Sequence, residues 1–425
     1  MEIKTGYKKT DVGIIPQDWD VKVVGDLFDV SGGFSTSRSH LSNEGNCYLH
    51  YGDIHGSEKQ YIDVENEYLS IPKLNVDLKR ISPTSLLTDG DIVFVDASED
   101  DEGASKHVVI RNPKAIPFIS GLHTIVLKSK DDSIANPYKE YCFLTHNIRR
   151  QFKFYAVGTK VTGISKTNIK KIKVVLPREK AEQSSIAEAL ADADALIASL
   201  EKLLAKKKNI KQGAMQLLLT GKKRLPGFSG EWENKQLSEV VDVYGGGTPS
   251  TANKEFWDGN IHWCTPTDIT ALKGSKYLFD TERKITSIGL KNIAAEILPI
   301  NSVIMTSRAT IGECAINKVP VSTNQGFKSL VPKTIDFEFL YYKILTQKSK
   351  LIKLGSGSTF FEVSKKDIEK LNLYIPALPQ EQAAIAQILS DMDMEIEELE
   401  RTLAKYQLLK QGMMQELLTG KKRLI

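Results

Sequence analysis

Three side chains in the second half of the sequence occur in the order that a metal-dependent nuclease needs. Asp268, Glu282 and Lys284 could supply two carboxylates to hold Mg²⁺ and an ammonium group beside them. The same order is common by chance, and the first half of the chain does not repeat it. A nuclease is therefore one alternative function, and Mg²⁺-dependent DNA cleavage by the isolated chain would reveal it.

Other catalytic motifs that act on nucleic acids are absent from the sequence. A base methyltransferase needs an Asn-Pro-Pro or Asp-Pro-Pro motif, and neither occurs. The run Gly245–Gly247 is followed by Thr248 and Pro249, which do not open a dinucleotide-binding helix. The Gly-Lys pairs at 221–222 and 420–421 lack the upstream glycine of an ATP-binding loop. The histidines and cysteines show no paired metal spacing. We therefore expect no catalysis, no metal and no cofactor in this chain.

Residue types that read DNA base edges lie in the loops of both halves. Base edges are recognised by Arg, Lys, Asn, Gln, Ser or Thr on held loops. In the first half the candidates are Arg38, His40, Tyr51, His55, Lys160, Thr162 and Lys166. In the second half the candidates are Thr248, Ser250, Lys254, Arg308, Asn324, Gln325, Lys328, Thr359 and Lys365. Each could instead be a turn, cap or surface residue, and 324–326 could be a tight turn.

The segments that would position these loops form a long internal repeat. Residues 182–225 and 381–424 are identical at roughly 26 of 44 positions without a gap, far above chance. Weaker similarity extends upstream, where Trp19 and Trp232 mark matching positions. A less similar body precedes each shared segment. The chain therefore alternates a variable body with a shared segment, twice.

Both shared segments are predicted to be long helices. Gly221 and Gly420 follow their expected carboxyl ends. Their apolar residues recur on a heptad seam, which consists of Ile186, Leu190, Ala193, Ile197, Leu200 and Leu204 in the first copy and Ile385, Leu389, Met392, Ile396, Leu399 and Leu403 in the second. Because both copies keep this stripe, we expect the helices to pack on each other, with packing on their own bodies as the alternative. A helix of about 38 residues spans about 57 Å, enough to hold two DNA-binding modules one duplex turn apart.

The bodies are predicted to be α+β, with short strand-like runs between turn residues and helical stretches at about 136–155 and 336–354. The formal net charge is only +4, so its distribution matters more than its size. About ten basic residues face one acid between Arg149 and Lys180, a segment that would attract a polyanion. No apolar run approaches the ~18 residues that span a membrane, and the start has no signal-peptide pattern. We therefore expect a cytoplasmic protein.

The alternation of two divergent bodies with two near-identical helices resembles the specificity (S) subunit of type I restriction–modification systems. The resemblance covers essentially the whole chain. It is carried by the pattern EQxxIAxxL…LLTGKKRL in both copies, by IPQDW near the start, and by TNQGFKSL and GSGSTFFEVSKKDI in the second body.

The resemblance implies an architecture and a set of partners. It implies target recognition domains at 1–178 and 222–377, each reading half of a bipartite site on double-stranded DNA. Spacer helices at 179–221 and 378–425 would pack as an antiparallel coiled coil with a pseudo-two-fold repeat. Two methyltransferase subunits would dock on them and restriction subunits would join outside, while S-adenosylmethionine, ATP and Mg²⁺ belong to these partners.

The main rival is a free-standing DNA-binding scaffold without enzyme partners. The two helices share residues that lie off the apolar seam, such as Gln212 with Gln411 and Gln216 with Gln415. Docking of two identical partners would use such positions, whereas a plain scaffold does not need them. The end of the second helix also lacks the entry segment that follows the first, and that segment stands at the start of the chain. We therefore expect the two termini to lie close together.

Overall fold

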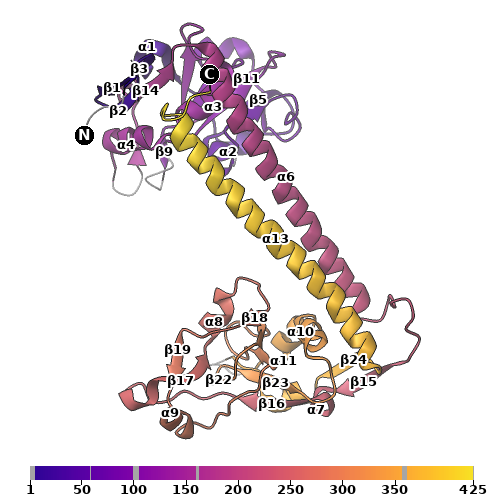
Figure 1. Cartoon of the computed structure of the whole chain (residues 1–425). Coiled ribbons are helices and arrows are strands. Elements are labelled where there is room, and N and C mark those ends of the chain that lie inside the picture. The colour runs from indigo at the N-terminus through magenta and orange to yellow at the C-terminus, as the bar shows by residue number, and fades with distance from the viewer. Residues whose placement is uncertain (1–4, 58, 99–104, 159–161, 357–360, 425) are drawn as a thin grey trace. The chain divides into compact units, whose positions relative to one another are not determined.

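The computed structural model describes residues 5–57, 59–98, 105–158, 162–356 and 361–424, and their contacts divide into two compact units. Unit 1 contains Met1–Ser199 and Leu403–Ile425, and unit 2 contains Leu200–Thr402. Each unit combines a body of strands and short helices with half of each of two long helices (Figure 1). We call these body 1 and body 2. The predicted α+β fold with two bodies and two long helices is confirmed.

The two long helices are α6, Lys180–Leu218, and α13, Pro379–Leu417, each of 39 residues. Both are followed by a glycine in the left-handed region, with φ of +71° at Gly221 and +69° at Gly420. Glycine adopts this conformation without steric cost and ends helices for that reason. At Gly420 a Cβ atom would also lie 2.4 Å from Cγ of Pro16. Both predicted ends of the helices therefore have a conformational cause.

The apolar seam of the helices lies inward. All twelve predicted seam residues are buried or half-buried. In unit 2, Lys211 of α6 pairs with Asp393 of α13, and Lys207 pairs with Glu395 at 2.5 Å. In unit 1, Lys410 pairs with Asp194. Residues late in one helix thus meet residues early in the other, so the helix halves pack antiparallel in each unit. The heptad pattern predicts their contact, and the family resemblance implies its antiparallel sense.

Each body contains a five-stranded sheet with the same strand connectivity. In unit 1 the order is β4 (Phe28–Gly32), β12 (Thr124–Ser129), β8 (Ile92–Val95), β10 (His107–Arg111) and β6 (Tyr61–Asp63). In unit 2 the order is β16 (Val241–Gly245), β23 (Lys328–Pro332), β20 (Val303–Met305), β21 (Cys314–Asn317) and β18 (Tyr277–Leu278). In both sheets only the last pair is parallel. The repeat therefore extends into the variable bodies as a shared backbone frame.

Smaller sheets repeat in the same way. A three-stranded sheet consists of β11 (Phe118–Ser120), β5 (Asn46–Leu49) and β7 (Lys73–Leu74) in unit 1, and of β22 (Val321–Thr323), β17 (Trp257–Cys264) and β19 (Arg283–Ile285) in unit 2. A strand before each long helix pairs with an earlier one, β14 (Lys173–Pro177) with β3 (Trp19–Val23) and β24 (Asn372–Pro376) with β15 (Trp232–Gln236). Unit 1 adds the pairs β13 (Thr162–Gly163) with β9 (Ala97–Ser98), and β1 (Tyr7–Thr10) with β2 (Gly13–Pro16).

Short helices complete the bodies. Unit 1 has α1 (Val24–Leu27), α2 (Tyr51–Gly56), α3 (Asn136–Cys142), α4 (His146–Tyr155) and α5 (Lys166–Ile169). Unit 2 has α7 (Leu237–Val240), α8 (Pro266–Ala271), α9 (Ser287–Lys291), α10 (Phe337–Leu345), α11 (Lys348–Leu354) and α12 (Lys365–Glu369). Each predicted helical stretch is thus two helices. In the first stretch, Thr145 separates the two helices. It is the N-cap of α4, and its hydroxyl accepts from the backbone N–H of Ile148 at 3.3 Å.

The ends of the long helices belong to the cores of the bodies. In unit 1, Ile186 and Leu190 of α6 are buried in one cluster with Leu417 and Leu418 from the end of α13. In unit 2, Ile385 and Leu389 of α13 share a cluster with Leu218 from the end of α6. Among the described residues, no helix is both long and apolar enough to cross a membrane.

A polar junction repeats where the start of one long helix meets the end of the other; we call it the helix-end junction. In unit 2, Arg224 donates to both oxygens of Glu381 at 2.6 and 2.7 Å, and Trp232 Nε1 donates to the same carboxylate at 3.2 Å. In unit 1, Trp19 and Arg423 donate to Glu182 at 3.1 and 2.8 Å. Both carboxylates are buried.

The two ends of the chain meet at the helix-end junction of unit 1. Arg423, beyond α13, also contacts both oxygens of Asp18 at 2.9 and 2.8 Å. Tyr7 donates its hydroxyl proton to the carbonyl of Gly420 at 2.9 Å. The expectation that the termini lie close together is therefore confirmed.

Candidate nucleic-acid interface

Two predicted base-reading residues of body 2 are brought together by a third residue that the sequence did not indicate. Arg308 Nε donates to Oε2 of Glu362 at 2.7 Å, and Lys328 Nζ donates to Oε1 of the same carboxylate at 2.6 Å. We call these three residues the Glu362 cluster. Lys328 begins β23, and Arg308 follows β20. One carboxylate thus fixes two cations that come from neighbouring strands of the sheet.

Backbone hydrogen bonds support the Glu362 cluster. Arg308 and Glu362 form an antiparallel bridge. Ser307 on one side accepts from the N–H of Val363 at 3.1 Å and donates its own N–H to Gly326 at 2.7 Å. Burial raises the pKa of the Glu362 carboxyl, but the hydrogen bonds from Lys328 and Arg308 outweigh burial and leave that pKa below its ordinary value. Glu362 is therefore a carboxylate at neutral pH.

The predicted residues Thr248, Asn324 and Gln325 lie beside one another. Thr248 donates its hydroxyl proton to Gln325 Oε1, and Asn324 Oδ1 accepts from the N–H of Gly326 at 2.8 Å. The alternative of a tight turn at 324–326 thus describes the role of Asn324. A Cβ atom at Gly246 would lie 1.9 Å from the carbonyl oxygen of Asn324, so glycine is required there for close backbone approach.

The other candidates in body 2 do not join this group through any contact recorded for the described residues. The carbonyl of Ser250 accepts from Trp257 Nε1 at 3.1 Å, so its backbone has a structural role. Lys254 is exposed at the start of a 3₁₀ turn, Lys254–Phe256. Lys365 pairs with Glu369 at 3.7 Å within α12. Thr359 lies outside the described residues.

In body 1, two candidates belong to an aromatic group. The ring of Tyr51 lies 4.4 Å from that of His50, 6.2 Å from that of His55 and 5.4 Å from that of His123. His123 contacts Asp96 at 3.2 Å. His50, His123 and Asp96 were not among the predicted residues, although His123 occupies the repeat position of Gly326 and could have been found by aligning the bodies.

Of the remaining candidates in body 1, Arg38 lies beside the aromatic group, because it pairs at 3.1 Å with Asp53 of α2, the helix that carries Tyr51 and His55. His40 contacts the hydroxyl of Thr36 at 3.2 Å. Thr162 lies in β13, and Lys166 begins α5. Lys160 lies outside the described residues.

The two bodies use one backbone frame for different side chains. In body 1 the backbone pair that corresponds to Arg308 and Glu362 is Ala97 with Gly163, the end of the β9–β13 ladder. Neither residue carries a charge. The repeat thus keeps the strand pairing at this edge and changes what the edge presents to a ligand.

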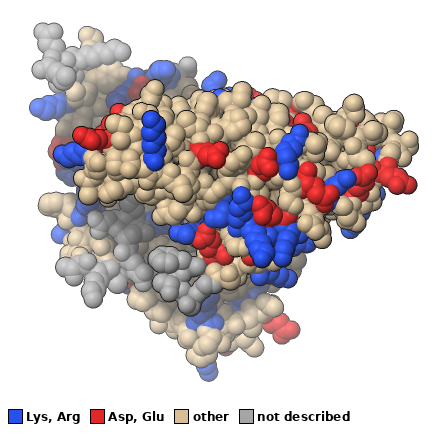
Figure 2. All heavy atoms as spheres, turned by 90° about the horizontal axis from the view of Figure 1, so that it is seen from below, with Lys and Arg blue, Asp and Glu red and all other residues tan. Residues whose placement is uncertain are grey.

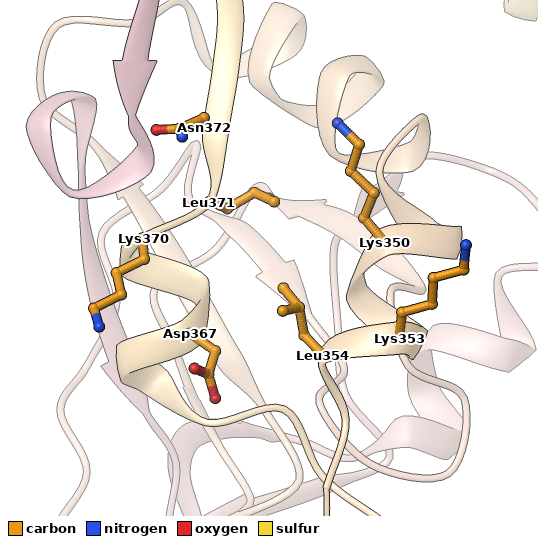
Figure 3. A pocket seen from close by; sticks show the side chains of 7 residues that line it. All are labelled: Lys350, Lys353, Leu354, Asp367, Lys370, Leu371 and Asn372. Atoms are coloured by element: carbon orange, nitrogen blue, oxygen red, sulfur yellow. The ribbon is translucent and has the colours of Figure 1, made fainter.

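A basic hollow of about 370 Å³ lies between α11, α12 and the start of β24. Its lining includes three lysines, Lys350, Lys353 and Lys370, and one acid, Asp367, with Leu354 and Leu371 between them. Figure 3 shows the three ammonium groups at the rim. No ion pair is recorded for these lysines within the part of the chain that the structure describes.

The positive charge of this hollow affects the pKa of a buried residue nearby. Burial, and then the nearby charge of Lys350, lower the pKa of Lys343 to about 8. The hollow was not predicted from the sequence, although Lys350 and Lys353 precede the GSGST loop and Lys370 follows it.

The basic segment from Arg149 to Lys180 is less positive than its sequence suggests. Acids from distant parts of unit 1 pair with three of its cations: Asp11 with Lys173, Asp20 with Arg178 at 2.9 Å, and Asp132 with Lys180 at 2.6 Å. Figure 2 shows Lys and Arg side chains close together on one face, with Asp and Glu side chains beside them. A one-dimensional charge count therefore overstates the attraction of the segment before α6 for a polyanion.

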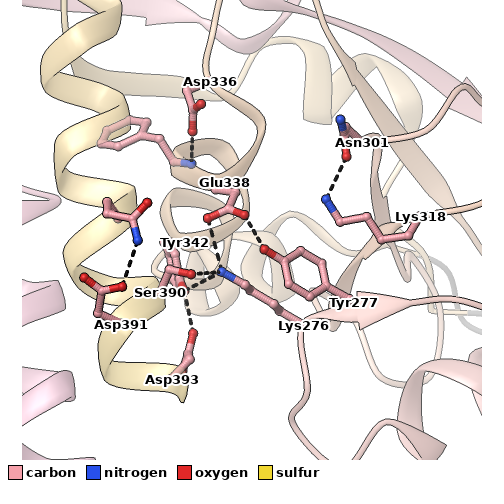
Figure 4. Close-up of polar contacts among 12 residues, drawn as sticks. Lys276, Tyr277, Asn301, Lys318, Asp336, Glu338, Tyr342, Ser390, Asp391 and Asp393 are labelled. Atoms are coloured by element: carbon pink, nitrogen blue, oxygen red, sulfur yellow. Dashed lines mark hydrogen bonds and ion pairs between the residues drawn. The ribbon is translucent and has the colours of Figure 1, made fainter. Parts of the chain in front are cut away.

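A buried polar network fixes body 2 to α13 (Figure 4). Lys276 donates to the hydroxyl of Ser390 on α13 at 2.6 Å and pairs with Glu338 of α10 at 3.2 Å. Tyr342 of α10 donates to Asp393 of α13 at 2.5 Å. Because these groups are buried and mutually satisfied, they hold the sheet that carries the Glu362 cluster in a fixed place on its helix.

The nuclease candidates have structural roles. The Asp268 carboxylate accepts from the N–H and hydroxyl of Thr265 at 2.7 and 2.6 Å, and from the N–H of Glu282 at 2.8 Å. Asp268 is the N3 residue of the capping box of α8, whose N-cap is Thr265. Lys284 pairs with Asp280 at 3.3 Å. Across the described residues, no group of three or more His, Cys, Asp or Glu could hold a metal ion.

Several curated proteins similar to this chain are named as specificity subunits of type I restriction enzymes. Curated relatives include the MjaIX specificity subunit of Methanocaldococcus jannaschii, 39% identical over 38% of each chain, and the putative MjaX specificity subunit of the same organism, 25% identical over 98% of this chain and 96% of the relative. The EcoR124I/EcoR124II specificity subunit of Escherichia coli is 29% identical over 54% of this chain and 57% of the relative.

Solved structures of similar fold are also type I proteins. The S subunit of a type I restriction–modification system from M. genitalium aligns with a TM-score of 0.58 at 13% identity, covering 98% of both chains. A structure from a study of type I complex assembly aligns with a TM-score of 0.55 at 15% identity, covering 96% of this chain and 99% of the other.

Both copies of the internal repeat match the same protein family. Residues 16–212 and 229–405 both match the family described as type I restriction modification DNA specificity domain. The two matches account for most of the sequence, and each joins one body to the greater part of the long helix that follows it. The chain therefore belongs to this family, and it is a non-catalytic specificity subunit rather than an enzyme.

Proposed function

We propose that this protein reads an asymmetric, bipartite site on double-stranded DNA, one half-site per body, and positions methyltransferase and restriction subunits there. The single observation that carries the proposal is the repeated frame with unlike edges. The same strand pairing presents Arg308 and Glu362 in body 2 but Ala97 and Gly163 in body 1. Two bodies that share a backbone frame but carry different side chains at this edge are suited to recognising two different half-sites.

The proposed modules follow the boundaries predicted from the sequence. Residues 1–178 and 222–377 are the target recognition domains, and residues 179–221 and 378–425 are the spacer helices. The candidate base-reading residues of each body are proposed contacts of that body's half-site. The protein would act in the cytoplasm, where its DNA lies.

Backbone phosphates are the proposed ligands of the basic hollow. Three lysines and the single acid Asp367 leave the hollow with a net positive charge beside Leu354 and Leu371, which suits the alternation of phosphate and deoxyribose along a DNA strand. Such contacts add affinity and orientation without sequence information. The hollow is formed by the helices on both sides of the segment that carries Glu362.

Partners are proposed to dock on the exposed faces of the long helices. Gln212 and Gln216 of α6 are exposed in unit 2, and Gln411 and Gln415 of α13 are exposed in unit 1. Each unit thus offers the same pair of glutamines, so one chain should bind two methyltransferase subunits. S-adenosylmethionine, ATP and Mg²⁺ would be bound by the partner subunits.

A body exchange tests the proposed function. Residues 1–175 are replaced by the corresponding body of a relative, the hybrid is co-expressed with its methyltransferase, and methylated bases are mapped across the genome. One half of the motif should change and the other should stay. A change in both halves would contradict the two-module proposal.

Partner number separates this function from its rival. Native mass spectrometry of the co-expressed complex should give two methyltransferase subunits per chain. A chain that binds its DNA motif but retains no methyltransferase would instead be a free-standing DNA-binding scaffold.

A further inference from the structure

We infer that Glu362 is a positioning residue for DNA recognition: it holds Arg308 and Lys328 side by side for base contacts and keeps both from binding phosphate without sequence preference. The inference rests on the proposed function and deepens it. Its basis is the salt bridge in which Arg308 Nη2 lies 2.6 Å from Oε2 and Lys328 Nζ lies 2.6 Å from Oε1 of the same carboxylate.

The burial of the three groups separates their roles. The Lys328 side chain is 14% exposed, that of Glu362 is 22% exposed, and that of Arg308 is 35% exposed. Lys328 and the carboxylate are therefore less accessible to a ligand than the guanidinium of Arg308. A half-buried carboxylate that faces two cations organises them more than it attracts solvent ions.

Rigid presentation matters because Arg and Lys are long and their ammonium or guanidinium groups are strongly attracted to phosphate. A free Arg or Lys near a duplex gains affinity at any sequence through counterion release. An arginine held in one orientation can instead place its fork on the two acceptors of a guanine. Glu362 has both effects, since it orients the fork and offsets one of the two charges.

The backbone makes this arrangement a property of the fold rather than of a flexible surface pair. The bridge between Arg308 and Glu362 brings the two chain segments together, and Ser356 exchanges two backbone hydrogen bonds of 3.0 Å with Glu362. The Ser307 hydroxyl lies 3.4 Å from Oε1 of Glu362. These contacts fix the main chain at Glu362 independently of the ion pairs that its carboxylate forms with Arg308 and Lys328.

The repeat gives an internal comparison. Body 1 has Ala97 and Gly163 at the corresponding positions, so it has no such carboxylate. The effect of removing Glu362 should therefore be confined to the half-site that body 2 reads. A general weakening of the protein would not have this confinement.

The test uses the complex assembled with its methyltransferase subunits and the variant Glu362→Gln. Binding is measured on duplexes that carry the mapped motif, the motif altered in one half-site, the motif altered in the other, or a scrambled sequence, at several salt concentrations. Discrimination at the half-site read by body 2 should fall about tenfold, the effect of one lost base contact of about 1.4 kcal/mol. Affinity for the scrambled duplex should rise about fivefold at physiological salt, with a salt slope steeper by about one.

Two further variants keep the test decisive. Asp242→Asn removes one negative charge from an exposed pair with Lys333 in the same body and should change neither discrimination nor scrambled-duplex affinity by more than about twofold. Glu362→Asp keeps the charge with a shorter reach and should restore part of the discrimination. It also serves as the test if Glu362→Gln does not fold, which thermal unfolding would reveal.

The outcomes separate this inference from the proposed function. If Glu362→Gln weakens binding to every duplex alike, or leaves discrimination intact, the positioning role is overturned while the proposed function stands. If the wild-type complex itself does not distinguish the motif from a scrambled duplex, the proposed function fails and this inference fails with it.

Discussion

The helix-end junctions and the recognition edges of the two units have diverged to very different extents. At the junctions the same residue types recur: Glu182 and Glu381, which are 199 positions apart, each accept from a tryptophan and an arginine. At the edges only the backbone pairing recurs, and Arg308 with Glu362 stands where body 1 has Ala97 with Gly163. Buried charges tolerate no change of partner, whereas an edge can change its side chains freely. The molecule thus keeps a constant frame that can carry different recognition surfaces.

The strongest test of this comparison removes a junction carboxylate. Glu381→Gln leaves Arg224 without its ion-pair partner at a site where the Glu381 side chain is only 1% exposed. Loss of one partner of a buried pair costs about 3–5 kcal/mol of unfolding free energy. Glu182→Gln should cost less in unit 1, because Arg423 keeps its pair with Asp18. Denaturant unfolding measures both.

A matched control for the junction variants is Glu400→Gln, because its pair with Lys208 is exposed. It should change unfolding free energy by less than about 0.5 kcal/mol. If Glu182→Gln and Glu381→Gln were as mild as this control, the shared motif would not be explained by structure and would have to be explained by partner binding.

The frame could be predicted from the sequence because its signals are local and repeated. Heptad spacing showed the seam of α6 and α13, and Gly221 and Gly420 marked their ends. The Glu362 cluster was only half predicted, since its members are 34 and 54 residues apart and nothing local links them. The residues whose role depends on long-range pairing are those that periodicity cannot reveal.

Charge gave the least reliable predictions. The basic segment before α6 attracted attention, but acids distant in sequence neutralise part of it. Asp268 was selected as a metal ligand because carboxylates bind metals, yet its oxygens are used by a helix cap. In both cases the sequence shows the type of side chain but not the residue with which it pairs in the fold. The base-reading candidates themselves stay predictions.

Acid sensitivity should distinguish the cores of the two bodies. His107 of β10 is fully buried between Phe94 and Phe143, with ring distances of 4.8 and 5.6 Å, and burial lowers its pKa from 6.5 to about 4. Cys314 stands at the same position of β21 in body 2. The folded state therefore keeps His107 neutral while the unfolded chain takes up a proton below pH 6.5.

This difference has a defined sign and size. The contribution of neutral His107 to stability is fully present above pH 6.5 and is lost as the pH falls toward 4, a change of about 3 kcal/mol. His107→Cys should remove that part of the pH dependence, and Cys314→His should add it to body 2. Unfolding free energies measured from pH 4 to 7.5 would contradict the prediction if the wild type and His107→Cys had parallel curves.

Phosphate contact at the basic hollow should affect affinity without affecting specificity. The combined variant Lys350→Gln, Lys353→Gln and Lys370→Gln should lower affinity about tenfold on motif and scrambled duplexes alike, with a salt slope shallower by about one to two. Lys333→Gln, from a pair with Asp242 at 3.4 Å, is the control. A change confined to the motif duplex would make the hollow a base-reading site, and no change would exclude it from the DNA interface.

The smallest expected effect concerns the charged pairs on the helix seam. Lys211 with Asp393 in unit 2 corresponds to Lys410 with Asp194 in unit 1, and each aspartate also accepts from a tyrosine of its own body.

The pairs differ in burial, which makes their comparison informative. Asp393 is 16% exposed and Asp194 is 38% exposed, while both lysines are 22% exposed. A double-mutant cycle with Lys→Met and Asp→Asn isolates each pairwise energy, and Met keeps the apolar stem on the seam. We expect a coupling of about 1–2 kcal/mol in unit 2 and about half of that in unit 1, because solvent screens the more exposed pair. Equal couplings would mean that burial does not control these pairs. A coupling near zero in both would mean that the apolar seam alone holds the helices, with the lysines retained at those positions for another reason.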